Sequence, residues 1–472
     1  MSAFKKAFAK VATVFSVADI RKKILFTVFI VVLFRFGSQI PVPFMNPAMV
    51  EGTFTAGILD FMNMLSGNAL SQATLFALGI SPYITSSIVM QLLCVAIPAL
   101  ERMSKEEEGK KTIQKITRFV TIGLALVMAI GYYLMLDRMG NAIEPITVSG
   151  NQYGFFTAVV IIASYCAGAS LVMWMGEKIN EKGIGNGISI ILFVNILVSF
   201  PSYLVKIFRA IGGTRTLADG STEAMSNWWL GTIIGVVGLV FIVAMIAFMV
   251  FMSDSERRIP VQYAKRVVGR KMYGGQSSNL PLKVNMTGVM PIIFASSIVS
   301  IPATIAAFAG KSSAKDGFWG LIANHFVQNT IPYTIVFLLL LLAFAYFYIA
   351  ISFNPVEVSN NLRKNGGFVP GIRPGKPTSD YITRVLSKIT FIGAICLMIV
   401  AGLPMIIGIF GQIFGTTAAA SATGAATYTD WYTLTYFAFS GNSLLIVIGV
   451  ALETVRDIES QMTLRHFKGF LE

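Results

Sequence analysis

The feature that most constrains the fold of this chain is a series of apolar runs, each about 20 residues long, that recur along its length. A helix of that length crosses a hydrocarbon core of about 30 Å. Only helices and closed barrels can span such a core, because hydrocarbon offers the backbone no hydrogen-bond partners. The runs are continuously apolar and do not alternate, which excludes barrel strands. The sequence therefore predicts an all-α polytopic membrane protein.

Composition agrees with this class. Hydrophobic residues make up 55% of the 472 residues and charged residues only 13%, whereas soluble domains average about 25% charged residues. Ten spans are predicted, in chain order 24–40, 75–97, 117–136, 154–175, 187–205, 229–252, 286–308, 332–353, 389–410 and 434–452. Residues 1–23 mix lysines with phenylalanines and predict an interfacial amphipathic helix. We expect the first span to be retained, since no small-residue cleavage site follows it.

The distribution of Lys and Arg predicts the orientation in the membrane. With the N-terminus placed inside, the cytoplasmic connections carry 30 of the 37 Lys and Arg residues, and the outward connections carry six. The remaining one is Arg35, which we expect to reach the outer interface from the first span. This excess satisfies the positive-inside rule. Both termini, including the tail 453–472, are therefore expected to be cytoplasmic.

Two of the cytoplasmic connections, 253–285 and 354–388, are long and basic. A basic loop is often only a topology signal that attracts anionic lipid. These two also contain Gly, Pro, aromatic and aliphatic residues, a mixture that favours docking to a large acidic or nucleic-acid-containing partner. The outward loop 411–430 is low in complexity, and no role is predicted for it.

Motifs that would carry chemistry are not found. The cysteines and histidines are isolated and lack the spacing of a zinc site or a disulfide framework: Cys94, Cys166, Cys396, His325 and His466. The segment "GIGNGI", 183–188, has neither the preceding strand nor the following Lys-Ser/Thr of a phosphate-binding loop. It is interpreted as a turn at a helix start. We expect no catalytic residue, no metal site and no cofactor.

Ionisable residues are missing from the middle of the predicted spans. Proton- and sodium-coupled transporters need titratable or ion-coordinating groups at that depth. A secondary transporter with an inverted repeat and a broken helix is the second hypothesis, and it would require such groups, which the spans lack. An intramembrane enzyme is a third, and it would require a nucleophile with a nearby base. Any driving force is expected to come from a partner.

Aliphatic pairs with polar neighbours mark three of the spans. Ile80 and Ile84 are four residues apart, as are Ile188 and Leu192, so each pair shares one helix face. This spacing alone is typical of lipid-facing residues. Hydroxyl and amide groups accompany the aliphatic residues and belong instead at helix–helix seams or water-filled vestibules: Thr85, Ser86, Ser87, Gln91, Asn186, Asn195, Ser296, Ser297 and Ser300.

Five long motifs follow one another along the chain. They are "FALGISPYITSSIVMQLL" (76–93), "GIGNGISI" (183–190), "LPLKVNMTGVMPIIFASSIVSIPATI" (280–305), "FNPVEVSNNLRKNGGFVPGIRPGKPT" (353–378) and "SGNSLLIVIGVALE" (440–453). Together they resemble the bacterial SecY family of protein-translocase channel subunits. The resemblance covers nearly the whole chain in order. It implies a channel in the bacterial plasma membrane that moves unfolded, signal-bearing polypeptides outward and releases transmembrane segments sideways into the bilayer.

The resemblance also implies the arrangement of the helices. Ten transmembrane helices would form two inverted five-helix halves around a central hourglass pore. The first half would comprise 24–210 and the second 229–452, joined by an outward hinge-side loop, 211–228. A plug at about 60–70 would fold into the outer funnel, with a helix following from about Thr74.

Site residues follow from the motif match. The pore ring would consist of Ile80, Ile84, Ile188, Leu192, Ile293 and Ile446, with Leu192 where the family commonly has isoleucine. The plug would include Asp60, Phe61, Met64, Leu65, Ser66, Gly67, Asn68 and Leu70. A lateral gate would lie between spans two and three and spans seven and eight, with Ser87, Gln91, Ser296 and Ser297 at its seam.

Partners are implied as well. The small membrane subunits SecE and SecG would brace the two halves, and the motor ATPase SecA or a translating ribosome would dock on the basic loops. The docking candidates are Lys265, Arg266, Arg270, Lys271 and Arg373. Secretory and membrane-protein precursors would be the cargo, and the lipid bilayer the surroundings.

Overall fold

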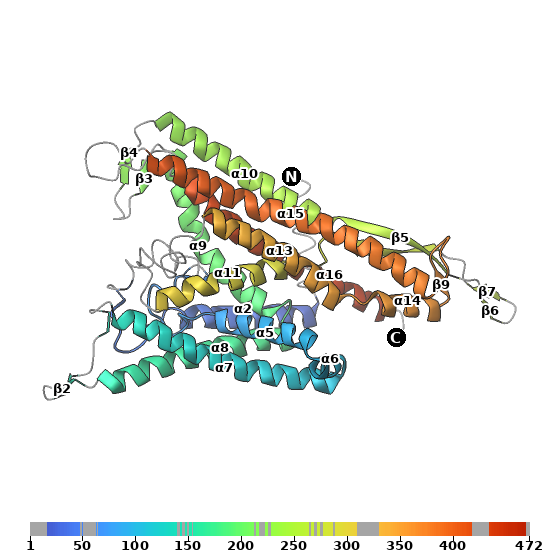
Figure 1. Cartoon of the computed structure of the whole chain (residues 1–472), viewed down its shortest axis with the longest axis horizontal. Coiled ribbons are helices and arrows are strands. Elements are labelled where there is room, and N and C mark those ends of the chain that lie inside the picture. The colour runs from blue at the N-terminus through green and yellow to red at the C-terminus, as the bar shows by residue number, and fades with distance from the viewer. Residues whose placement is uncertain are drawn as a thin grey trace.

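Long helices dominate the computed structural model of the chain (Figure 1). The structure describes residues 17–47, 50, 63, 65–138, 142–143, 147–148, 151–152, 154–211, 214–216, 222–224, 228–263, 266–268, 271–273, 277–286, 288–308, 330–417 and 434–468. The helices are α2 (Ala18–Gly37), α5 (Ser81–Ala96), α6 (Pro98–Lys105), α7 (Glu107–Asp137), α8 (Gly154–Lys182), α9 (Gly187–Ile211), α10 (Trp228–Asp254), α11 (Met290–Phe308), α13 (Ile331–Ser352), α14 (Pro355–Lys364), α15 (Lys376–Thr417) and α16 (Leu434–Lys468).

Each predicted span falls on one of these helices, in the predicted order. Among the described residues, α7, α8, α10, α13 and α15 are each long and apolar enough to cross a membrane. The pair α5 and α6, bent by 105° at its break, would make a sixth crossing, and the apolar parts of α9 and α11 are shorter. The chain is a multi-pass helical membrane protein.

One predicted helix start was wrong. The second span was expected from 75, with a helix start near Thr74, but α5 begins at Ser81. Gly79 adopts a left-handed φ of 55°, which a helix does not continue through, and Pro82 stands in the first turn, where its missing N–H costs nothing. Helix α15 extends beyond the ninth predicted span, 389–410, because it begins at Lys376, inside the basic connection 354–388.

In the described connections between the helices there are four small antiparallel sheets. Two are hairpins, β1 (Thr147–Val148) with β2 (Asn151–Gln152) and β3 (Thr214–Thr216) with β4 (Thr222–Ala224). A third hairpin joins β6 (Arg266–Val268) to β7 (Lys271–Tyr273). The fourth has the order β8-β5-β9, in which β5 (Glu256–Tyr263) pairs with β8 (Ser277–Lys283) and with β9 (Gly367–Phe368).

The helices form two groups that meet along two lines of contact. Helices α2, α5, α7 and α8 lie together on one side in Figure 1, and α10, α13, α15 and α16 lie together on the other. Helix α9 contacts α8 in the first group and α10 and α16 in the second. Helix α11 contacts α13 in the second group and α5 and α7 in the first. Helices α9 and α11 therefore join the groups at separate places.

Two hydrophobic cores hold the helices. One cluster of buried residues draws members from both groups, including Ile84, Leu192, Phe337 and Ile446. The other lies within the first group around Tyr132 of α7 and Tyr165 of α8, whose rings meet edge to face with centroids 5.1 Å apart. Such aromatic pairs add about 0.5–1.5 kcal/mol beyond the area they bury. The first group thus has a core of its own and shares the larger one.

Gly168 of α8 shows how closely these parts pack. A Cβ atom at this position would lie 1.9 Å from the carbonyl oxygen of Leu75, which belongs to the turns before α5. We predict that Gly168→Ala lowers the stability of the protein by about 1–3 kcal/mol, because backbone must move to admit the methyl group. The midpoint of thermal unfolding in detergent micelles measures this.

Gly123 of α7 provides the matched control. Nothing lies within 4 Å of a Cβ placed there, so Gly123→Ala is expected to leave the midpoint unchanged or to raise it, as alanine favours a helix by about 1 kcal/mol. Equal midpoints for both variants would contradict the packing described for α8.

Candidate functional site

The six predicted ring residues all lie in or against one large cluster of buried residues. Five of the six are at most 4% exposed and belong to this cluster: Ile80, Ile84, Leu192, Ile293 and Ile446. The sixth, Ile188, is partly buried and packs against that cluster. They come from α5 and the residue before it, from α9, from α11 and from α16, hence from both helix groups and both joining helices. Branched aliphatic side chains from separate helices thus share one hydrophobic cluster.

The segment 65–80, which precedes α5, is buried but not helical. Gly67, Asn68, Ala73 and Gly79 all have positive φ, and this repeated left-handed backbone explains why turns replace a regular helix. Leu65 packs against the cluster that contains the ring residues. The segment therefore lies against the cluster to which the predicted ring residues belong.

Three neighbouring helices hold this segment by its backbone carbonyl groups. The hydroxyl of Tyr132 on α7 donates to the carbonyl oxygen of Leu70 at 2.6 Å. The side-chain amide of Asn195 on α9 donates to the carbonyl oxygen of Leu65 at 2.8 Å, and Tyr165 on α8 donates to Ala73 at 3.5 Å. Such bonds satisfy carbonyl groups that a helix would otherwise pair internally.

Polar side chains within the segment complete its hydrogen bonding. Ser66 donates through Oγ to the carbonyl oxygen of Asn63 at 2.8 Å, and the Asn63 Oδ1 accepts from the backbone N–H of Ser71 at 2.9 Å. Ser66, Asn68 and Leu70 of the predicted plug lie here together with Leu65 and Gly67. The other predicted plug residues, Asp60, Phe61 and Met64, lie outside the described residues.

The side chain of Arg35 at the end of α2 reaches the segment 65–80. Its Nη1 atom is buried, has no hydrogen-bond partner among the described residues, and lies 3.0 Å from where a Cβ on Gly67 would be. The residue as a whole is of intermediate exposure, and its place at the outer interface stays a prediction.

The four predicted seam residues divide between two helices in contact. Ser87 and Gln91 lie on α5, and Ser296 and Ser297 lie on α11. Among the described residues their side-chain hydrogen bonds stay within a helix, from Gln91 Nε2 to Ser87 Oγ at 3.3 Å and from Ser296 Oγ to the carbonyl oxygen of Ile293 at 2.9 Å. The contact between α5 and α11 is thus not fastened by these groups.

Ser86, next to Ser87, lies at a contact between helices, as expected of the polar side chains in this span. It is fully buried and donates to the carbonyl oxygen of Thr117 at 2.9 Å, which ties α5 to α7 within the first group. Successive helix positions point about 100° apart, so Ser86 and Ser87 face different neighbours.

The two basic connections form one structure, which the sequence analysis did not predict. Strand β5 comes from the first connection and β9 from the second, and they pair through Gln262 with Phe368 and Tyr263 with Gly367. A small apolar cluster beneath the sheet, with Ile259, Leu282, Val369 and Ile389 at its centre, joins it to α15.

Arg373 lies on an exposed loop that is braced on both sides. Gly371 and Gly375, with φ of 82° and 104°, shape the turn around it. The hydroxyl of Ser359 on α14 donates to the carbonyl oxygen of Gly375 at 2.8 Å, and Thr378 of α15 donates to that of Arg373 at 2.8 Å. An exposed guanidinium is therefore presented on a fixed backbone.

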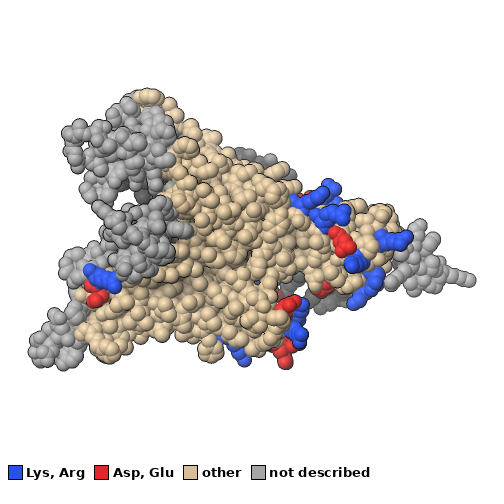
Figure 2. Space-filling view, in the orientation of Figure 1, with Lys and Arg blue, Asp and Glu red and all other residues tan. Residues whose placement is uncertain are grey.

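The other docking candidates fall near the tip of the hairpin. Arg266 begins β6 and Lys271 begins β7, while Lys265 and Arg270 lie outside the described residues. Figure 2 shows several blue Lys and Arg side chains, with red Asp or Glu among them, around the end of the molecule where β5 and α14 lie. In this view a broad tan surface separates them from a smaller charged group at the opposite end.

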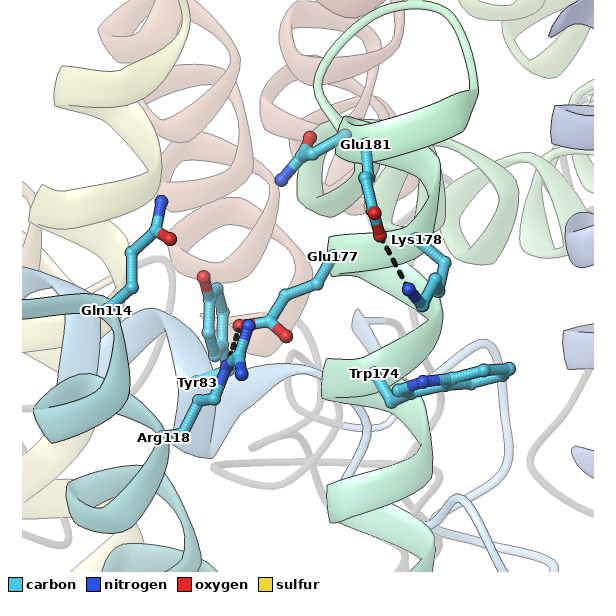
Figure 3. Close-up of a pocket in the computed structure, with 8 residues that line it drawn as sticks. Tyr83, Gln114, Arg118, Trp174, Glu177, Lys178 and Glu181 are labelled. Atoms are coloured by element: carbon cyan, nitrogen blue, oxygen red, sulfur yellow. Dashed lines mark hydrogen bonds and ion pairs between the residues drawn. The ribbon is translucent and has the colours of Figure 1, made fainter. Parts of the chain in front are cut away.

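A pocket of about 470 Å³ lies between α5, α7 and α8 (Figure 3). Arg118 Nε of α7 meets Glu177 Oε1 of α8 at 2.8 Å, and Lys178 Nζ meets Glu181 Oε2 at 2.5 Å along α8. Exposed pairs of this kind contribute about 0–1 kcal/mol, so the pair between α7 and α8 joins the helices only weakly. None of these residues was predicted from the sequence as part of a site.

The cysteines and metal-binding residue types form no site in the described part of the chain. Cys94, Cys166 and Cys396 are free thiols, each of intermediate exposure. In the described ranges no three His, Cys, Asp or Glu side chains come close enough to hold a metal ion.

These features define a class: a multi-pass helical membrane protein whose two helix groups share an aliphatic cluster backed by a buried non-helical segment. Comparison with known proteins identifies the family. Residues 74–455 match the SecY family model, so the chain belongs to the SecY family.

Relatives and solved structures agree with this assignment. The protein translocase subunit SecY of Streptomyces galbus is 42% identical over 98% of this chain and 99% of its own length. A solved protein-conducting channel covers 94% of this chain and 93% of its own, with a TM-score of 0.61 at 15% identity. Sec61 in the canine ribosome-channel complex covers 94% and 93%, with a TM-score of 0.55 at 15% identity. At 15% sequence identity, these two solved structures show that the chain shares their fold.

The contact between α5 and α11 can be tested directly. In a chain whose three native cysteines are replaced by serine, Ser87→Cys with Ser297→Cys is expected to give an intramolecular product with a short bismaleimide, since the two helices touch. Electrophoretic mobility reports the product. Ser87→Cys with Val455→Cys on α16 is the control pair. Failure of the first pair to react, with both thiols accessible to a small maleimide, would contradict the seam.

Proposed function

We propose that this chain is the central subunit of a protein-conducting channel in the bacterial plasma membrane. It carries unfolded, signal-bearing polypeptides outward and releases apolar segments sideways into lipid. The single observation that supports this most is the gathering of Ile80, Ile84, Leu192, Ile293 and Ile446 from α5, α9, α11 and α16. Membership of the SecY family supports the same function. Export of a precursor into proteoliposomes is the general test.

The residue types of the ring suit such a conduit. Branched aliphatic side chains at a constriction expel water, which raises a barrier to ions while no polypeptide is present. They also offer no hydrogen-bond partner that would hold one passing side chain longer than the next. A charged ring would conduct ions in the idle channel. The aliphatic centre therefore fits a pore that is indifferent to cargo sequence and closed at rest.

The buried segment 65–80 acts as the plug in this proposal. Its backbone is held by a few hydrogen bonds from Tyr132, Tyr165 and Asn195, each worth about 1 kcal/mol net. Such a segment remains in place in the resting channel yet can be displaced by a chain that gains more on entry. Its turns are tolerated at membrane depth because they are buried among α7, α8 and α9 and hydrogen-bonded to them rather than exposed to lipid.

The contact of α11 with α5 and α7 would serve as the lateral gate. Interhelical polar contacts in membranes average only about 0.6 kcal/mol, and the seam side chains here bond within their own helices. An apolar signal helix can therefore compete with this contact. The opposite contact, through α9, would be the hinge of two inverted halves with ten membrane crossings.

The sheet β8-β5-β9, the hairpin β6–β7 and the loop of Arg373 would form the docking surface for a driving partner. Sec61 has been solved in a ribosome-channel complex, and the yeast Ssh1 complex bound to the yeast 80S ribosome, both with this fold. We propose a translating ribosome or the SecA motor for this surface, with SecE and SecG as small bracing subunits. The surface and both termini would then be cytoplasmic.

This assignment makes the chain a conduit and not an enzyme. The motor partner would hydrolyse ATP, since the sequence carries no phosphate-binding motif. A gradient-driven secondary transporter remains the competing function, and saturable uptake of a small solute by proteoliposomes would favour it over the channel.

Replacing Ile446 by asparagine tests the ring. An amide in the constriction should admit water, so we expect idle ion conductance to rise by about tenfold or more, and precursors with defective signal sequences to be exported more readily. Planar-bilayer recordings and an export assay measure the two effects. Ile446→Leu, which stays apolar at similar volume, is the control and should behave as the parent. Idle conductance equal in both variants would remove Ile446 from the constriction.

Reversing the charge of Arg373 tests the docking surface. Arg373→Glu is expected to reduce partner-driven export by about tenfold, the effect of losing roughly 1.4 kcal/mol, while leaving the folding of the channel intact. Arg138→Glu, the same reversal on an exposed side chain after α7, should have little effect. Export by the Arg373 variant at the control's rate would show that the partner docks elsewhere.

A further inference from the structure

The glycine-rich segment 183–187, between α8 and α9, lies where both helix groups meet. Thr27 of α2 accepts a hydrogen bond through Oγ1 from the backbone N–H of Ile184 at 3.1 Å. Asp457 of α16 accepts one through Oδ2 from the backbone N–H of Gly185 at 2.9 Å, although the two residues are 272 positions apart in the sequence. The start of α9 is therefore tied to one helix from each group.

The glycines make these approaches possible. Gly185 has a φ of 74°, the left-handed region that other residues rarely adopt. A Cβ on Gly183 would lie 2.6 Å from Thr27 Oγ1, and one on Gly187 would lie 2.0 Å from the carbonyl oxygen of Gly176. The turn that was interpreted from sequence as a helix start is thus shaped to present its N–H groups to neighbouring helices.

The end of α16 that carries Asp457 is itself anchored. The side-chain amide of Gln461 donates to Asp457 Oδ2 at 3.3 Å and accepts through Oε1 from Lys23 Nζ of α2 at 3.0 Å. Arg456 pairs through Nη2 with Asp254 Oδ1 of α10 at 2.8 Å. The carboxylate of Asp457, on a helix anchored in this way, can hold the glycine-rich segment 183–187 in a fixed position.

The hydrogen bond between Gly185 and Asp457 joins the start of α9 to α16, the two helices that carry three of the six predicted ring residues. Ile188 follows Gly185 by three residues on α9, and Ile446 precedes Asp457 by eleven residues on α16, about three turns or 16 Å along the helix. Helices α9 and α16 are in direct contact. The bond between Asp457 and Gly185 therefore sets the axial position of Ile188 and Leu192 relative to Ile446.

We propose that Asp457 is a positioning residue of the resting channel, which holds α9 against α16 and so keeps the aliphatic ring closed until a signal sequence enters. The inference rests on the function proposed above. A carboxylate suits this role for two reasons. Its hydrogen bonds are charge-assisted and about twice as strong as neutral ones, and its charge lies at the positive end of α9. Asparagine would keep the acceptor and lose the charge.

The test compares two precursors in proteoliposomes, one with an intact signal sequence and one with a charge in its apolar core. For Asp457→Ala we expect export of the defective precursor, relative to the intact one, to rise about tenfold over the parent, with higher idle conductance. Asp457→Asn should give an intermediate rise, and Asp457→Glu should restore the parental ratio. Glu108→Gln, an exposed carboxylate at the start of α7, is the control and should not change the ratio.

The outcomes separate this inference from the proposed function. A parent channel that exports neither precursor would overturn the proposed function. A parent that exports the intact precursor, with all Asp457 variants sharing its ratio, would overturn only the role of Asp457. A loss of both exports in proportion, with a lower unfolding midpoint for Asp457→Ala and Asp457→Asn alike, would also overturn it, since that is the behaviour of a residue that only stabilises the fold.

Discussion

Exclusion of water by branched aliphatic side chains is the interaction that the proposed channel relies on. No single helix can enclose such a cluster, because a helix offers one face to it and the remaining directions must be closed by others. Here α5, α9, α11 and α16 each contribute to one buried cluster, and they belong to both helix groups and to the two helices that join them. The proposed constriction would therefore be closed only while the groups keep their relative position, and a motion that separates them would open it.

The contacts that fix this position differ in strength from one side to the other. At the α9 side, hydrogen bonds from Thr27 and Asp457 reach the turn before α9, and the cluster around Leu192 is fully buried. At the α11 side, the hydrogen bonds of the seam residues Gln91 and Ser296 stay within their own helices, and Ser86 ties α5 to α7. Of two such contacts, the one that its seam residues do not fasten opens more easily. This difference supports the lateral gate proposed at α11 and the hinge proposed at α9.

Sequence alone predicted the helices well, because runs of apolar residues report burial in lipid or protein directly. Helical spacing singled out the pairs Ile80 with Ile84 and Ile188 with Leu192, and the resemblance added Ile293 and Ile446. The left-handed backbone at Ala73 could not be found in this way, because alanine gives no sign of positive φ, whereas Gly67 and Asn68 are residue types that adopt it more readily. The start of α5 was misplaced although Gly79 and Pro82 mark it in the sequence.

Contacts between residues that are far apart in the sequence were also not predicted. Strand β9 is two residues long and joins β5 from a separate connection, so no local pattern marks it. Asp457 resembles any acidic residue on the exposed end of a helix until Gly185 is seen beside it. In both cases the missing information was a contact, not a propensity.

Photocrosslinking from a stalled secretory chain can show whether the predicted ring residues line one shared pore. A secretory chain is stalled in the channel with a single photoreactive residue, and the sites that it labels are mapped while the residue is moved along the chain. If the ring is shared, we expect one probe position to label Ile80, Ile188 and Ile293 together, at the start of α5, on α9 and on α11. Labels confined to one helix at every probe position, or found only on lipid, would contradict a shared aliphatic constriction.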